Sequence, residues 1–119
     1  YDLVYKATDA GFAAANVGNT CAGVYKAMQQ IMESSDTNGG NHVGRMGHGL
    51  GLQVTEPPSI MSNDKTLLRE NMIITIEPCL EYAPNILQVH EENILITIIF
   101  YCFNEAFQNI RIYFCIIIE

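Results

Sequence analysis

The chain has no tryptophan and little positive charge, with six lysine and arginine residues against 13 aspartate and glutamate residues. The net charge of −7 argues against nucleic acid or an anionic membrane surface as the main partner, because both require a basic face. Apolar residues make up 49% of the 119 residues, which is enough for a packed core in one small domain or in part of a larger one. We therefore expect a soluble protein with neither a nucleic-acid nor a membrane partner.

The four cysteines form no Cys-X-X-Cys pair and lack the density that is typical of a small secreted protein. They are Cys21, Cys79, Cys102 and Cys115. We interpret them as buried or incidental thiols in a reducing compartment, and we expect a cytoplasmic protein. The sequence starts at Tyr1 with neither an initiator methionine nor a signal-peptide pattern, so we expect it to begin inside a domain.

A long uninterrupted apolar stretch is also missing. Residues 98–119 are rich in isoleucine and aromatic residues, but polar residues between Asn104 and Arg111 leave no apolar span of roughly 18 residues, which argues against a membrane anchor. This segment has no clear period, so we expect no organised element in it. We divide the chain into residues 1–97 and an atypical apolar tail at 98–119. Translation past a misread reading-frame boundary is one interpretation of this tail.

Two helices are expected before the first strands. Residues 1–16 are rich in alanine and free of proline, and their apolar residues recur at helical spacing. Residues 21–36 carry an amphipathic stripe that is typical of core packing. The stripe consists of Val24, Met28, Ile31 and Met32. Gly18 is placed to end the first helix, and Thr20 is placed to cap the second.

Strands are expected in the second part of the chain. Residues 71–78 form a β-rich run that ends at a proline, and residues 86–97 form a longer run with three polar residues in its middle. Turns are expected at 36–41 and at Pro84–Asn85. The order of two helices and then several strands predicts the α+β class, with antiparallel strands joined by short turns.

Three potential metal ligands stand out from these elements. Glu77 ends an apolar strand and Glu91 lies inside the next one, where a carboxylate is costly unless it is paired or binds a cation. His48 lies between two glycines. One nitrogen and two carboxylate oxygens suit Mn, Zn, Co or Fe and leave positions open for water and substrate. The alternative is a satisfied loop histidine with two solvent-facing glutamates.

With their surroundings these residues form three motifs, "GHGLGL…TEPP", "MIITIEP" and "VHEENILIT". In this order, residues 1–97 resemble the C-terminal half of the pita-bread domain found in methionine aminopeptidase, aminopeptidase P, prolidase and creatinase. The resemblance makes His48 and Glu77 metal ligands with catalytic roles, and Glu91 the carboxylate that bridges two metals. It also places Arg45 at a common family position in the substrate cleft. The glycines beside His48 are expected to let the backbone turn tightly and to keep bulk away from the ring.

Three features depart from the family pattern. No suitably spaced pair of aspartates is present, so we expect two further ligands upstream of Tyr1 and two metal ions in the intact domain. Peptidase members usually have a histidine where Thr55 lies in the substrate site, and threonine carries no titratable proton near neutral pH. Cys79 replaces the glycine of Glu-Pro-Gly and would cost about 1 kcal/mol or more if this position required φ > 0.

The resemblance implies a metal-dependent hydrolase that cleaves a C–N bond of a short peptide, such as an Xaa-Pro peptide, or of a peptide-like small molecule. It also implies that the parent protein is a homodimer. Thr55 favours an alternative, an ectoine hydrolase-like or lyase-type member that acts on a small non-peptide substrate. A catalytically inactive relative without metal is a further alternative, favoured by Thr55 and Cys79. We expect the 119-residue segment alone to be inactive and poorly soluble, since half a domain exposes sheet edges.

Overall fold

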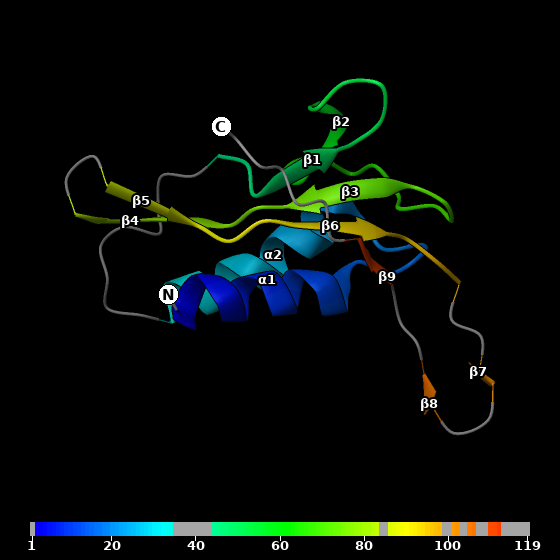
Figure 1. Ribbon diagram of the computed structural model, residues 1–119, viewed down its shortest axis with the longest axis horizontal. Helices are drawn as coiled ribbons and strands as arrows, with labels where there is room; N and C mark the ends of the chain where they lie inside the picture. Colours follow the sequence, from blue (N-terminus) through cyan, green and yellow to red (C-terminus); the bar gives the residue numbers. More distant parts are fainter. Residues whose placement is uncertain are drawn as a thin grey trace.

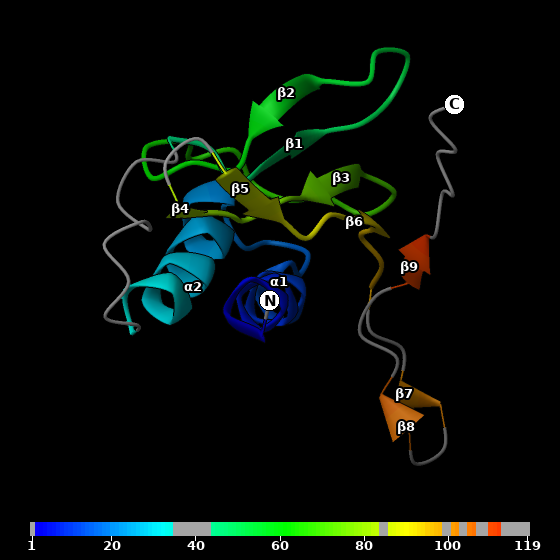
Figure 2. The same ribbon diagram turned by 60° about the vertical axis from the view of Figure 1, so that its left-hand side comes forward.

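Two helices lie against one face of an antiparallel sheet in the computed structural model of the chain (Figure 1). The structure describes residues 2–34, 44–83 and 86–98, and the backbone of residues 101–102, 105–106 and 110–112. Within these residues, the other face of the sheet carries no helix (Figure 2). The expected α+β order, with two helices followed by antiparallel strands, is confirmed.

The helices α1 (Asp2–Ala14) and α2 (Cys21–Glu33) form where the alanine-rich and the amphipathic segments predict them. Thr20 caps α2 as expected, because its hydroxyl accepts the Gly23 N–H at 3.0 Å. The predicted apolar stripe of α2 faces the core. It comprises the buried residues Val24, Met28 and Met32 and the partly buried Ile31.

The end of α1 differs from the prediction. The helix stops at Ala14, whereas Gly18 adopts a left-handed φ of +87° only in the turn that follows. The side-chain amide of Asn16 donates to the carbonyl of Ala13, and that of Asn19 donates to the carbonyl of Ala14, both at 2.7 Å. Two asparagine side chains therefore satisfy the last helical carbonyls, and the expectation that Gly18 ends the helix is wrong.

The main sheet has five antiparallel strands in the order β2-β1-β3-β6-β9. These strands are β1 (Gly47–Gly49), β2 (Glu56–Ser59), β3 (Ile73–Ile76), β6 (Glu92–Leu95) and β9 (Ile110–Ile112). Two separate pairs complete the strands. They are β4 (Cys79–Ala83) with β5 (Ile86–Val89), and β7 (Tyr101–Cys102) with β8 (Glu105–Ala106).

Residue alternation gives the main sheet two distinct faces. Ile74 and Ile76 of β3 and Ile94 of β6 are fully buried and belong to the core that packs against the helices. Because successive side chains in a strand point to opposite faces, Thr75 and Asn93 lie on the face away from the helices. The register pairs these two residues directly, so one polar row crosses the open face.

The expected single strand at 86–97 is wrong, because the structure has two strands there, interrupted at His90 and Glu91. The chain changes its pairing partner at this point, since β5 pairs with β4 and β6 pairs with β3. Glu91 therefore lies in a break between strands and is exposed, whereas its neighbour Glu92 is the buried residue at 8% exposure.

The C-terminal segment is also more ordered than expected. It contains β7, β8 and β9, and β9 pairs with β6 at the edge of the main sheet, so the expectation of no organised element there is wrong. Its non-native origin stays a prediction. The expected turns at 36–41 and at Pro84–Asn85 lie outside the described residues. Among the described residues, neither α1 nor α2 has the length and hydrophobicity that a membrane-spanning helix requires.

Candidate functional site

The two glycines beside His48 allow β1 to lie between two close neighbouring backbones. A Cβ on Gly47 would lie 2.1 Å from the carbonyl oxygen of Thr75, and one on Gly49 would lie 2.3 Å from that of Pro57. Gly47 also has a φ of +154°, which favours glycine. The expected tight turn is therefore wrong: the backbone is a short strand, and the glycines are needed because the backbones of β3 and of Pro57 approach so closely.

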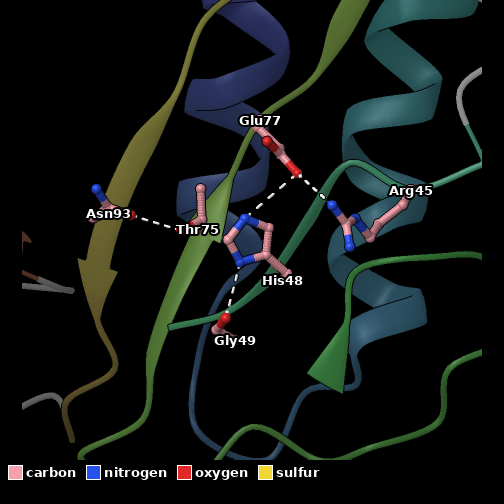
Figure 3. A network of polar contacts seen from close by, with 6 residues as sticks. All are labelled: Arg45, His48, Gly49, Thr75, Glu77 and Asn93. Carbon is pink, nitrogen blue, oxygen red and sulfur yellow. Dashed lines mark hydrogen bonds and ion pairs between the residues drawn. The ribbon is translucent and has the colours of Figure 1, made fainter. Parts of the chain in front are cut away.

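His48 is held in one orientation and one tautomer. Its side chain is buried, and Nδ1 lies 2.9 Å from the carbonyl oxygen of Gly49 (Figure 3). Since a carbonyl can only accept a hydrogen bond, Nδ1 carries the proton in this contact. The other ring nitrogen, Nε2, lies 3.7 Å from Oε1 of Glu77.

Glu77 reaches the same face of the sheet because it follows Thr75 by two residues along the chain. Its backbone N–H donates to the carbonyl of Met46 at 3.0 Å, which fixes the backbone just beyond β3. The carboxylate is 24% exposed, and its Oε1 also lies 3.4 Å from a guanidinium nitrogen of Arg45. Arg45, predicted to line the substrate cleft, thus contacts one of the predicted metal ligands.

A second polar pair lies beside His48 on this face. The hydroxyl of Thr75 donates to Oδ1 of Asn93 at 2.6 Å, and Thr75 is paired with His48 in the register of β1 and β3. Figure 3 shows this pair, His48 and Glu77 in front of the sheet, with both helices behind it. Sequence reasoning missed both residues. The signal for Thr75 was its position as the polar residue in the run Ile73–Ile76.

His48, Thr75, Asn93 and Glu91 line a common open cavity of about 330 Å³. The rest of its wall comprises Leu50, Gly51, Val54 and Ile73. Such a volume is at the lower end of the range of small-molecule sites. The cavity is therefore lined by both polar and apolar side chains.

The structure brings together two of the three predicted metal ligands, His48 and Glu77, and places Glu91 on the wall of the same cavity as His48. Among the described residues, no three His, Cys, Asp or Glu side chains are grouped closely enough to hold one ion. The three-ligand set stays a prediction. Thr55 is exposed in the bend at 51–55, and its neighbour Val54 rather than Thr55 lines the cavity.

Cys79 lies after Pro78 in the sequence Glu77–Cys79 and is the first residue of β4, where its strand partner is Val89. Among the described residues, Asn71 is the non-glycine residue with a positive φ, so Cys79 does not carry the strain considered for it. Burial raises the pKa of its thiol, and the carboxylates of Glu77 and Glu81 add to this effect. Cys79 is thus a neutral, partly buried thiol.

The fold and the site together define a half of a pita-bread domain, with helices behind the sheet and an imidazole–carboxylate pair on its open face. A family model described as metallopeptidase family M24 matches residues 1–113, and the chain belongs to this family. The expected family is therefore confirmed. The match extends beyond Thr97, where the resemblance in the sequence was placed to end.

Two relatives with similar sequences agree with this family assignment. The chain is 35% identical over 98 residues to an Xaa-Pro dipeptidase of Pyrococcus furiosus, which covers 82% of this chain and 28% of the dipeptidase. It is 36% identical over 96 residues to a protein from Mycoplasma pneumoniae named as a putative Xaa-Pro aminopeptidase, which covers 81% of this chain and 27% of that protein. The chain thus spans less than a third of the length of these relatives.

Solved structures support the same fold. The prolidase from Pyrococcus furiosus matches with a TM-score of 0.76 and 31% identity, covering 93% of this chain and 30% of the prolidase. The N-terminal domain of the FACT complex subunit SPT16 from Cicer arietinum matches with a TM-score of 0.73 at 18% identity, which shows a shared fold alone. The fold by itself therefore does not determine the activity.

Proposed function

We propose that this chain supplies one half of the catalytic domain of a metal-dependent hydrolase that cleaves a C–N bond in an Xaa-Pro peptide or a similar small substrate. One observation carries the proposal: His48 is fixed by the Gly49 carbonyl at Nδ1 so that its other ring nitrogen, Nε2, faces the carboxylate of Glu77. This pair lies on the open face of a sheet, and His48 lines a cavity of suitable size for a small ligand.

The donor chemistry of His48 and Glu77, an imidazole nitrogen beside a carboxylate oxygen, fits a divalent metal ion such as Mn, Zn, Co or Fe. A histidine ligand that donates its other ring N–H to a backbone carbonyl is the usual arrangement around a metal, because this contact fixes the tautomer and raises the basicity of the ligand. His48 and Glu77 would hold the metal, together with Glu91 from the wall of the cavity that His48 also lines. A bound metal would polarise the scissile carbonyl and lower the pKa of a water molecule.

The neighbouring residues have separate roles in this proposal. Glu77 Oε1 accepts a proton during the reaction, and the Arg45 guanidinium holds the carboxylate in place. Leu50, Val54 and Ile73 form an apolar wall that binds the aliphatic part of the substrate and excludes water from it. These roles use contacts on the described face of the sheet.

The test uses the longest polypeptide that the gene encodes, with Ala-Pro as substrate and Mn²⁺ as the added metal. We expect chelation to abolish hydrolysis, added Mn²⁺ to restore it, and His48→Ala to lower kcat/KM by at least about 100-fold. Lys26→Ala, at an exposed position on α2, is the control and should retain activity. Full turnover after complete metal removal would refute the proposal.

Thr55 supports a second candidate, a member that acts on a small cyclic or other non-peptide substrate, or one without catalytic activity. The side chain at this position is exposed near the cavity and cannot exchange a proton near neutral pH. We expect Thr55→His to raise Xaa-Pro hydrolysis if the peptidase proposal holds. Less than one equivalent of metal per chain, with no gain from added Mn²⁺, would favour the inactive relative.

A further inference from the structure

The hydroxyl of Thr8 connects helix α1 to the break between β5 and β6. Thr8 is buried at 1% exposure, and its Oγ1 lies 3.2 Å from Nδ1 of His90 and 3.3 Å from the carbonyl oxygen of His90. The same oxygen lies 3.0 Å from the carbonyl oxygen of Val4, one helical turn earlier. A single side chain thus contacts both the ring and the backbone of a residue that is 82 positions away.

These distances fit one consistent set of hydrogen bonds. The two carbonyl oxygens can only accept, so the Thr8 hydroxyl donates its hydrogen to the carbonyl of Val4 or of His90. A lone pair of Thr8 Oγ1 remains free to accept from Nδ1–H of His90. The ring of Tyr5 lies edge-on against the His90 ring, with centroids 5.1 Å apart, and supports its orientation.

The carbonyl that Thr8 contacts belongs to the peptide bond between His90 and Glu91. In extended backbone, neighbouring side chains point to opposite sides. His90 faces α1, and Glu91 lies on the wall of the cavity that contains His48. No strand pairing holds His90 and Glu91, since β5 ends before them and β6 begins after them. Figure 1 shows this connection passing close to α1.

We propose that Thr8 and His90 are positioning residues that hold Glu91 at the edge of the cavity, where it serves as a metal ligand. This inference rests on the proposed function. Helix α1 thereby acts on the site through the peptide bond that precedes Glu91, although its own side chains lie on the opposite face of the sheet. The competing explanation is that Thr8 and His90 merely satisfy each other as buried polar groups.

The experiment compares two matched pairs of variants in the longest polypeptide that the gene encodes. Thr8→Val removes the hydroxyl at nearly constant shape, and Thr8→Ser retains it. His90→Leu removes the ring donor, and His90→Asn retains a donor near the position of Nδ1. The readouts are the hydrogen exchange of the backbone amides in residues 88–93, measured by mass spectrometry, and the affinity for Mn²⁺ alone, measured by calorimetry.

We expect Thr8→Val and His90→Leu each to speed the exchange of this segment by three- to tenfold and to weaken Mn²⁺ binding by about tenfold. Thr8→Ser and His90→Asn should stay near wild-type values. The double variant Thr8→Val/His90→Leu should lose less than the sum of the two single variants, because both remove the contact between Thr8 Oγ1 and His90 Nδ1.

The inference would be overturned if Thr8→Val kept the wild-type amide exchange in residues 88–93 and the wild-type affinity for Mn²⁺. It would also be overturned if Thr8→Ser and Thr8→Val lost Mn²⁺ affinity to the same extent. If Thr8→Val does not fold, the His90 pair gives the answer. Faster exchange and weaker Mn²⁺ binding in His90→Leu but not in His90→Asn would support the inference, and equal values in the two variants would overturn it. A wild-type protein that does not bind Mn²⁺ would refute the proposed function instead. The exchange of residues 88–93 would still show whether Thr8 holds this segment.

Discussion

Replacing Gly47 by alanine tests whether the site depends on the close approach of β1 and β3. The new Cβ would lie 2.1 Å from the Thr75 carbonyl oxygen, whereas such contacts are essentially never shorter than 3.0 Å. The two strands must therefore separate by about 0.9 Å, which is typical of overpacking that costs about 1–3 kcal/mol. The φ of +154° lies in a backbone region that residues with a side chain rarely adopt, which adds about 1–2 kcal/mol.

The expected total loss of about 2–5 kcal/mol corresponds to a decrease in Tm of about 10 °C, which differential scanning calorimetry measures directly. Because β1 carries His48 and β3 leads to Glu77, the variant should also bind Mn²⁺ more weakly. Gly44→Ala is the matched control, since its Cβ meets no atom within 4 Å. If Gly47→Ala melts at the same temperature as Gly44→Ala, the argument from close packing is refuted.

Three further predictions concern the residues around the site and the helices. Arg45→Met should lower kcat for Ala-Pro by about tenfold, because the Glu77 carboxylate loses the guanidinium that holds it. Arg45→Lys should give a kcat between those of Arg45→Met and wild type. An unchanged kcat in Arg45→Met would contradict this role of Arg45. Thr20→Ala should lower the free energy of unfolding in urea by about 1 kcal/mol, and Thr20→Ser should stay within a few tenths of wild type. Burial raises the pKa of the Cys21 thiol from its ordinary 9.0 to about 11, with a further contribution from Asp64. As the pH rises, the Cys21 thiol loses its proton in the unfolded chain before it does so in the folded chain, so the free energy of unfolding should fall between pH 9.0 and about 11. Cys21→Ala should remove this part of the decline, which urea titrations at several pH values would measure.

Local patterns were sufficient to place the two helices, and they also carry the signal for the two faces of β3, which was not used. The apolar stripe of α2 and the cap at Thr20 follow from periodicity and from the chemistry of a single side chain. The alternation in Ile73–Ile76 places Thr75 away from the core without any knowledge of its partners. Such features depend on residues within a few positions of one another, which is the range over which sequence patterns are informative.

Features that depend on distant partners were missed or wrongly explained. The break at His90 arises because two strands on either side pair with different partners, and sequence alternation says nothing about partner choice. The glycines beside His48 are required by carbonyl groups of other segments, so their purpose was wrongly assigned to a turn. The contact between Thr8 and His90 spans 82 positions and has no local signal.

The alternation in β3 also limits how this protein can change during evolution. Within four residues, Ile74 and Ile76 fill the core while Thr75 and the following Glu77 face the cavity side. An insertion or deletion of one residue in this strand would exchange the two sets, turning isoleucines to the open face and polar groups toward the helices. Substitutions can adjust either face separately, whereas changes in length should be confined to connections such as the exposed bend at 51–55.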